Sequence, residues 1–278
     1  MSVRKLMMVA LRLTLVVYAA LIVGRLAGLP IAWWVVLAPL GVLLALSLGQ
    51  GGLGRRSRAA RANPPPAVEV AVPVAGRWSV LNSPADKVPS HGTHGYGQTY
   101  AIDIVAEPAP GARPHFSRLW PVARRNEDFP AFGEPLLAVA DATVVHATDR
   151  RRDHLSRNSL PAVAYLLLLE SAAREMGGAG FIVGNHLVLD LGGGTYAMYA
   201  HLQRGSLRVR AGDRVREGQV LARCGNSGNS SEPHLHFQLM DHPDLDVAHG
   251  IPFRWRDIGV PANGEVFRTD EPAAREAT

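Results

Sequence analysis

Hydrophobic residues dominate the start of the chain. The apolar run from residue 6 to residue 48 is interrupted mainly by Arg12, Arg25, Gly28, Pro30 and Pro39. A single helix over this run would measure about 65 Å, roughly twice the thickness of a bilayer core. The pattern therefore predicts two transmembrane helices, near residues 6–24 and 30–49, joined by a turn.

The alternative for the first apolar run is a cleaved signal peptide. It fits less well, because the run lacks a small-residue cleavage site and the second run is itself long enough to span a bilayer. Basic residues flank both outer ends of the two helices, and the positive-inside rule would place both ends in the cytoplasm. These residues are Arg4 and Lys5 on one side and Arg55, Arg56, Arg58 and Arg61 on the other.

Beyond residue 66 the pattern changes to short β-rich runs, several of them separated by glycine-rich turns. Short strands with turns at about ten-residue spacing predict a small, mainly β fold, an antiparallel sandwich or barrel. Residues 162–176 have a helical composition and are too short to span a membrane, so we expect a packing helix inserted between strands. The expected strands are residues 68–74, 100–105, 136–146, 185–191, 196–201, 219–224 and 234–240.

These patterns divide the chain into four parts. Residues 1–54 are the expected membrane segment, and residues 55–75 are a basic, proline-rich linker. Residues 76–262 form the β domain, in which residues 107–133 are expected to be a long surface loop. Residues 263–278 are expected to be a polar, disordered tail.

The net charge of +5 belongs to the N-terminal segment. Residues 1–62 hold eight basic and no acidic residues, so the remainder of the chain carries 21 − 24 = −3. A mildly acidic body gives no support to nucleic-acid binding. The one cysteine, Cys224, excludes an internal disulfide and a multi-cysteine metal site, and we expect it to be a packed residue.

Candidate chemistry begins with a histidine pair in an apolar strand. His234 and His236 are two residues apart, so both imidazoles would lie on the same face of the strand. A flexible loop at residues 225–231 precedes them. Two half-buried surface histidines are the plain alternative for this tripeptide taken alone.

Other potential metal ligands occur at the ends of other expected strands. His201 ends one strand, and Asp103 interrupts another, where burial without a partner would be costly. His91 and His94 lie on a glycine-rich turn just before Asp103. One carboxylate and two or three imidazoles suit a tetrahedral zinc ion that keeps one position open for water.

The order of these motifs resembles the lysostaphin-type zinc endopeptidases. The resemblance is dense over residues 184–237, weaker over 91–146, and absent from residues 1–75 and the inserts at 107–133 and 150–180. The segments that carry it are Gly184-Asn185-His186-Leu187-Val188, Tyr199-Ala200-His201-Leu202, Gly212-Asp213, Gly218-Gln219, Gly225 with Ser227-Gly228, Pro233-His234-Leu235-His236-Phe237 and, upstream, Ile102-Asp103-Ile104.

The resemblance implies a small antiparallel β fold and hydrolysis of peptide bonds in peptidoglycan stem peptides or cross-bridges. It implies one zinc per chain, with Asp103 and His236 as ligands, and His201 and His234 as the histidines that activate water and stabilise the oxyanion. The family's first ligand histidine lies four residues before the aspartate, where this chain has Thr99. We expect His91 to be the third ligand, with His94 as the alternative.

The sequence thus predicts a membrane-anchored zinc metalloendopeptidase of a bacterial cell envelope. The resemblance places its domain outside the cytoplasm and the arginine distribution places it inside, so the orientation stays open. A non-catalytic family member that binds or regulates cell-wall hydrolases is the main alternative, favoured by Thr99. A histidine phosphotransfer protein is another, whereas a biotinyl or lipoyl carrier is excluded because neither Lys5 nor Lys87 lies near a hairpin tip.

Overall fold

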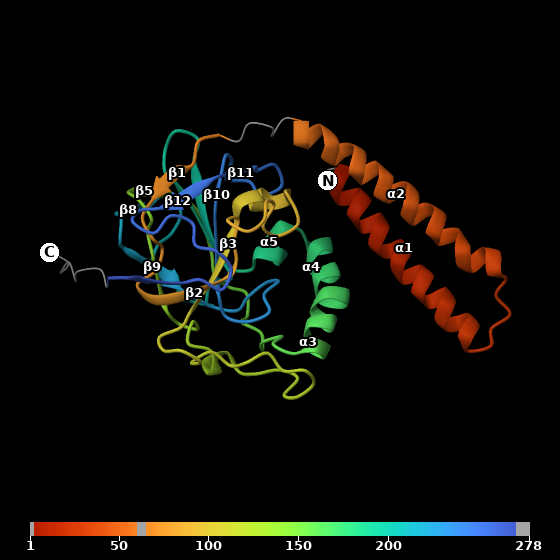
Figure 1. The fold of residues 1–278 in the computed structure, drawn as a ribbon. Helices are drawn as coiled ribbons and strands as arrows, with labels where there is room; N and C mark the ends of the chain where they lie inside the picture. Colours follow the sequence, from red (N-terminus) through yellow and green to blue (C-terminus); the bar gives the residue numbers. More distant parts are fainter. Residues whose placement is uncertain (1–2, 60–64, 271–278) are drawn as a thin grey trace. The chain divides into compact units, whose positions relative to one another are not determined.

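The computed structural model describes residues 3–59 and 65–270. The chain separates into two compact units, Met1–Pro64 and Pro65–Thr278. The first unit consists of two helices, α1 (Val3–Leu26) and α2 (Trp33–Ala59), which form a hairpin (Figure 1). The turn between them is held by Arg25, whose guanidinium lies 4.1 Å from the ring centre of Trp33 and donates to the carbonyl of Ile31.

The prediction of a transmembrane hairpin at residues 6–49 is wrong, although two helices do form there. Within the part of the chain that the structure describes, no helix is both long and apolar enough to cross a membrane. Arg12 and Arg25 limit the charge-free part of α1 to twelve residues, and α2 contains Pro39 and runs on into a segment rich in glycine and arginine. A spanning helix needs about 20 apolar residues. Three further predictions depended on the transmembrane hairpin and are not supported either. They are the membrane segment, the membrane as a partner and the membrane-anchored location.

The second unit is mainly β, as the sequence predicts. Its main sheet has the order β13-β2-β3-β10-β7-β6-β5-β8, with β11 added to β10, and all of its pairs are antiparallel. Two small sheets pair β4 with β9 and β1 with β12. The strands are β1 (Val68–Val70), β2 (Gly76–Asn82), β3 (Ile102–Ala106), β4 (Pro135–Leu137), β5 (Ala142–Thr148), β6 (His186–Asp190), β7 (Tyr196–Ala200), β8 (Arg214–Val215), β9 (Val220–Arg223), β10 (Leu235–Met240), β11 (Gly250–Ile251), β12 (Phe253–Trp255) and β13 (Val266–Thr269).

Strand β10 lies at the centre of the fold and is buried along its whole length. Its alternate residues Leu235, Phe237 and Leu239 belong to the main hydrophobic core, which also contains Trp78 and Trp255. The residues between them project from the opposite face of the strand, because successive side chains of a strand alternate. That second face carries a smaller apolar cluster and, as shown below, the candidate site.

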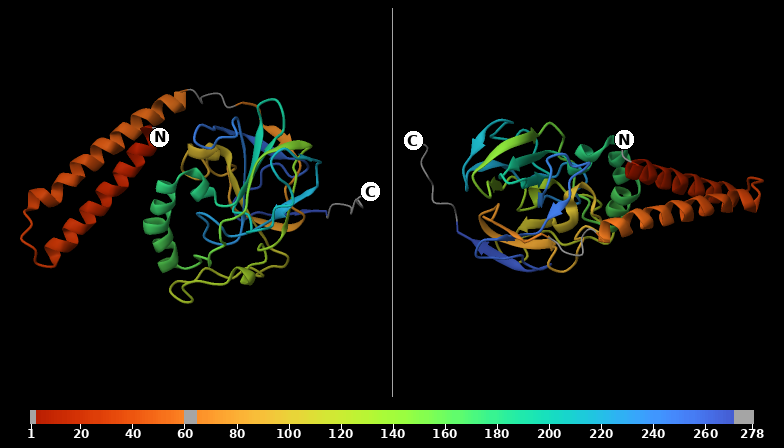
Figure 2. Two further views of the ribbon diagram at one scale, coloured as in Figure 1. Left: turned by 180° about the vertical axis from the view of Figure 1, so that it is seen from behind. Right: turned by 90° about the horizontal axis from the view of Figure 1, so that it is seen from above.

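The helical insert is less regular than the sequence predicts. Instead of one helix at residues 162–176 there are α3 (Leu160–Tyr165), a π-helical turn η3 (Leu166–Glu170), α4 (Ser171–Gly177) and α5 (Ala179–Val183). Figures 1 and 2 show this segment along one side of the strands. It packs through one side only, since Leu167, Leu168 and Leu169 are each at least 60% exposed. Two short 3-10 helices, η1 (Gly95–Tyr100) and η2 (Asn126–Asp128), complete the described helices.

Several strands differ from the predicted ranges. The run at 136–146 divides into β4 and β5, because the chain bends at residues 138–141 and its two parts pair with different strands. The segment from residue 263 includes β13, which pairs with β2, where a disordered tail was expected. Residues 271–278 of that tail lie outside the described residues. The isolated Cys224 is buried, and burial raises the pKa of its thiol, which agrees with a packed residue.

The hydroxyl of Tyr199, on β7, is hydrogen-bonded to the backbone at the end of β4. This group donates to the carbonyl of Leu137 at 2.9 Å and accepts from the amide of Val139 at 3.0 Å. Burial raises the pKa of the phenol, so it keeps its proton at every physiological pH. The hydroxyl therefore satisfies two buried backbone groups at once.

We expect Tyr199→Phe to lower the free energy of unfolding by about 1–3 kcal/mol, because both backbone groups lose their partner. Tyr196→Phe on the same strand is the matched control, since that side chain is only partly buried. Chemical denaturation of the two variants tests this. Equal stability of both would contradict the bridging role of Tyr199.

His186 and His146 stack with their ring centres 4.5 Å apart. His186 is buried, and its Nδ1 donates to the carbonyl of Gly184 at 2.9 Å. Burial lowers the pKa of His186 to about 4, with further lowering from His146 and Arg151. The folded chain thus keeps this imidazole neutral at a pH where the unfolded chain protonates it.

Stability should therefore fall as the pH drops from about 6.5 toward 4, at a rate of up to about 1.4 kcal/mol per pH unit from this group. Above pH 6.5 His186 does not lower the stability of the fold, and below that pH it lowers the stability progressively. His186→Gln should flatten this part of the stability profile, and His115→Gln at an exposed position should not. An unchanged profile in His186→Gln would show that other groups cause any acid loss.

Candidate metal and catalytic site

The candidate site is assembled by the register of three neighbouring strands. On β3 and β10, Asp103 lies directly opposite His236. On the other side of β10, His236 lies opposite Ala200, the last residue of β7. His201 follows at once, in a left-handed conformation (φ 61°) that turns the chain away from the sheet. Strand pairing alone thus brings three of the five predicted side chains together.

Asp103 is the centre of this cluster. Its Oδ2 lies 2.8 Å from His91 Nε2, and its Oδ1 lies 2.8 Å from His236 Nδ1. One ligand atom from each of these three residues lies within 4.8 Å of the others, close enough for a single metal ion. His234 Nε2 lies 3.6 Å from the same Oδ1. The carboxylate and two imidazoles are the donor types of a zinc site.

His91 and His94 differ in what they contact. His91 lies edge-on to His236, with ring centres 4.8 Å apart, and its Nδ1 lies 3.0 Å from Ser90 Oγ. His94 Nδ1 instead lies 3.1 Å from the hydroxyl of Thr99, and His94 is not part of the three-residue cluster. The buried Thr99 likewise stays outside it.

His201 and His234 face each other, with ring centres 4.8 Å apart. The Nδ1 of His201 lies 2.8 Å from the carbonyl of Ser227, and the Nδ1 of His234 lies 2.8 Å from the carbonyl of Glu232. A carbonyl only accepts, so in both rings Nδ1 carries the proton. In the neutral rings, Nε2 is then a free proton acceptor.

Charge and burial set the protonation of the cluster. Burial alone would raise the pKa of Asp103, but the charges of His91 and His234, together with the close contacts that His236 and His91 make with the carboxylate, hold it well below its usual value. Burial is also the main reason why the pKa of His201 is well below its usual value, so His201 is neutral at pH 7. The cluster offers a permanent carboxylate beside a neutral imidazole.

The loop at residues 225–231 fits closely against the end of β6. A Cβ at Gly228 would lie 2.4 Å from the amide nitrogen of Gly184, and one at Gly184 would lie 2.6 Å from the carbonyl carbon of Ser227. Both glycines also have positive φ angles. The glycines of this motif therefore allow the close packing that places the Ser227 carbonyl next to His201. This packing explains why the motif contains glycines, which have no reactive side chain.

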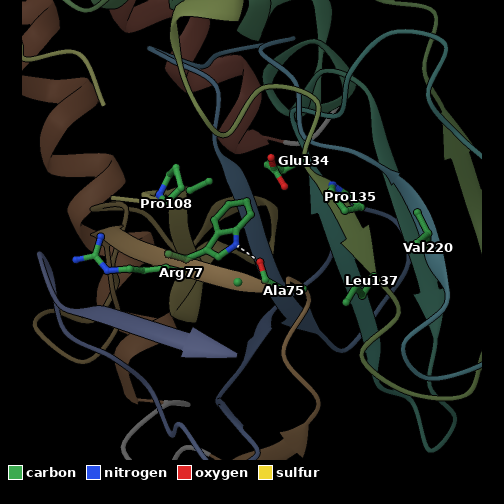
Figure 3. Close-up of a pocket in the computed structure, with 10 residues that line it drawn as sticks. Ala75, Arg77, Pro108, Glu134, Pro135, Leu137 and Val220 are labelled. Carbon is green, nitrogen blue, oxygen red and sulfur yellow. Dashed lines mark hydrogen bonds between the residues drawn. The ribbon is translucent and has the colours of Figure 1, made fainter. Parts of the chain in front are cut away.

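A cavity of about 350 Å³ lies elsewhere in the body, between β2 and β4 (Figure 3). Its walls include Arg77, Trp78, Glu134 and Leu137, and it contains none of the five predicted site residues. Burial raises the pKa of Glu134, partly offset by Arg223.

Sequence reasoning did not single out the residues that hold the imidazoles in place. Gln238, two residues beyond His236, accepts from that ring, and the Ser227 and Glu232 carbonyls accept from the other two. The alternation of β10 could have indicated Gln238, because residues i and i+2 share a face. The two carbonyls have no sequence signal, since every residue carries one.

Residues 171–247 match the family model described as peptidase family M23. The chain is 36% identical over 85 residues to endolysin 2638A of Staphylococcus phage 2638A, which covers 30% of this chain and 16% of the endolysin. It is 39% identical over 67 residues to the glycyl-glycine endopeptidase ALE-1 of Staphylococcus capitis, which covers 24% of this chain and 18% of the relative. The chain thus spans less than a fifth of the length of either relative.

Among solved structures, the catalytic domain of lysostaphin from Staphylococcus simulans aligns with 57% of this chain and 86% of its own, at 19% identity and a TM-score of 0.31. The segment that matches the family model includes His201, His234, His236 and the loop at residues 225–231. The predicted resemblance to the lysostaphin-type peptidases is confirmed over residues 171–247, the segment that matches the model of peptidase family M23.

Proposed function

We propose that the Pro65–Thr278 unit is a zinc-dependent endopeptidase that hydrolyses peptide bonds in peptidoglycan. The observation that carries the proposal is the contact of Asp103 with both His91 and His236 at 2.8 Å. These three side chains would hold one zinc per chain and leave a fourth position open. The names of the two relatives, an endolysin and a glycyl-glycine endopeptidase, support a cell-wall peptide as the substrate.

The donor set fits zinc on physical grounds. His236 donates its Nε2 proton to Gln238 at 3.0 Å, so in the neutral ring Nδ1 presents a lone pair to Asp103 Oδ1 only 2.8 Å away. In the neutral cluster these two acceptor atoms would repel each other, and a cation bound by both would remove that repulsion. Zinc held by these residues would supply a Lewis acid that polarises the scissile carbonyl and lowers the pKa of a water molecule to about 7.

His201 and His234 handle protons in this proposal. The neutral His201 offers Nε2 as the acceptor for a proton of the attacking water, and its bond to the Ser227 carbonyl prevents the ring from turning away. His234 is oriented in the same manner by Glu232 and contacts the substrate oxygen when it carries both protons. The proton taken from water then goes to the leaving amine.

We expect the full-length chain to contain one zinc ion, and His236→Ala, Asp103→Ala and His91→Ala each to lose most of it. His94→Ala is the matched control, because its imidazole contacts Thr99 and lies outside the cluster. Elemental analysis and zinc affinities of purified variants test the assignment. Loss of zinc in His94→Ala alone would transfer the ligand role to His94.

His201→Ala and His234→Ala should each keep most of the zinc and lower peptidoglycan hydrolysis by about 100-fold or more, because acid–base and electrostatic catalysis contribute that much. Release of soluble amines from purified peptidoglycan, with and without glycine cross-bridges, measures the activity. Release of zinc from either variant would exchange the ligand and catalytic roles.

A non-catalytic member of the family is the second candidate, and Thr99 in the usual ligand position favours it. Such a protein would bind peptidoglycan without cleaving it. A wild-type chain that contains zinc and binds peptidoglycan but releases no amines would establish this candidate in place of the enzyme.

A further inference from the structure

Gln238 is a completely buried polar residue next to the proposed zinc ligand His236. The two residues project from the same face of β10 because they are two positions apart. The side-chain amide of Gln238 spans two groups: its Oε1 lies 3.0 Å from His236 Nε2, and its Nε2 lies 2.8 Å from the carbonyl of Tyr96. This amide is neither one of the proposed zinc ligands nor one of the groups proposed to transfer a proton.

The Tyr96 carbonyl determines which way the amide points. A carbonyl can only accept, so the NH₂ group of Gln238 must face Tyr96 and its oxygen must face His236. An oxygen at 3.0 Å requires the imidazole to donate, which places the ring proton on Nε2. The bare Nδ1 is then directed at Asp103.

The turn that carries this carbonyl is built closely around the amide. Tyr96 itself has a left-handed backbone (φ 58°), which is uncommon for a residue with a side chain. A Cβ on the next residue, Gly97 (φ 73°), would lie 2.6 Å from the Gln238 nitrogen. The glycine thus leaves the space that the amide occupies.

We propose that Gln238 is the positioning residue of the metal site: it fixes the tautomer and orientation of His236 so that Nδ1 is presented to the metal. The inference rests on the proposed zinc site. Its physical basis is that a ligand histidine held through its second nitrogen binds metal more tightly, since the ring needs no reorientation and no loss of a proton from the binding nitrogen.

Chelator competition on the full-length chain tests the role. Gln238→Met has a similar shape but only a weak acceptor, and it should weaken zinc binding about 10- to 100-fold. Gln238→Glu keeps an oxygen for the Nε2 proton but loses the donor to the Tyr96 carbonyl, so it should weaken zinc binding less than Gln238→Met does. Gln203→Met, at a partly exposed glutamine outside the cluster, is the control and should bind as wild type does. The visible spectrum of the cobalt-substituted protein should change more in Gln238→Met than in Gln238→Glu.

A substitution on the other side of the amide provides an independent variant. Gly97→Ala should weaken zinc binding by displacing the amide, whereas Gly111→Ala should not. Gly111 has nearly the same φ (75°), but a Cβ there meets no atom within 4 Å. The pair separates the contact with Gln238 from the backbone strain that both substitutions share.

A measurement on the wild-type chain needs no substitution. A long-range ¹H–¹⁵N spectrum of the zinc-loaded protein should show the His236 proton on Nε2 and the metal on Nδ1. The reverse pattern would overturn the inference, as would wild-type affinity in Gln238→Met, or equal losses in Gln238→Met and Gln238→Glu, which would indicate a packing role. If the wild-type chain binds no zinc at all, the proposed function fails instead.

Discussion

The contact of Asp103 with three imidazoles organises the candidate site, and it depends on the register of β3 against β10. Asp103 and His236 are opposite one another across the pair, and the next pairing, β10 with β7, brings the end of β7 and His201 to the same place. If either strand shifted by one residue, its site residue would point to the other face of the sheet, toward the main hydrophobic core, because side chains alternate along a strand. Packing of the core face therefore also maintains the site.

The two faces of β10 explain how a polar cluster exists in so buried a strand. One face contributes Leu235 and Phe237 to the main core, which fixes the strand in place. The other face carries His236 and Gln238, where the Gln238 amide accepts from His236 Nε2 and donates to the Tyr96 carbonyl. A buried polar group costs little when it is hydrogen-bonded. The same hydrogen bonds fix the orientation of the imidazole. The bonds that satisfy these buried polar groups therefore also set the geometry of the site.

The sequence predicted the mainly β body well because its strands are marked by local signals: alternation, β-branched residues and glycine turns. The sequence was less informative where the structure depends on which distant segments pair with each other. The run at 136–146 is continuous in sequence, but its halves pair with β9 and β6, and the chain bends between them. The strand β13 is only four residues long and was mistaken for a tail, because its partner β2 lies far away in the sequence. At the N-terminus, hydropathy indicated the two helices but not their inability to span a membrane.

The sequence by itself determined the resemblance to the lysostaphin-type peptidases and the kinds of side chain at the candidate site, because these are properties of motifs: a His-x-His strand, a strand aspartate and a glycine loop. It left His91 and His94 open, since both lie on one flexible turn within reach of Asp103. Only the tertiary structure decided that His91 contacts the carboxylate while His94 turns to Thr99. The physical reason is that the path of this turn depends on its contact with β10, through the Tyr96 carbonyl and Gln238, a pairing between residues 142 positions apart.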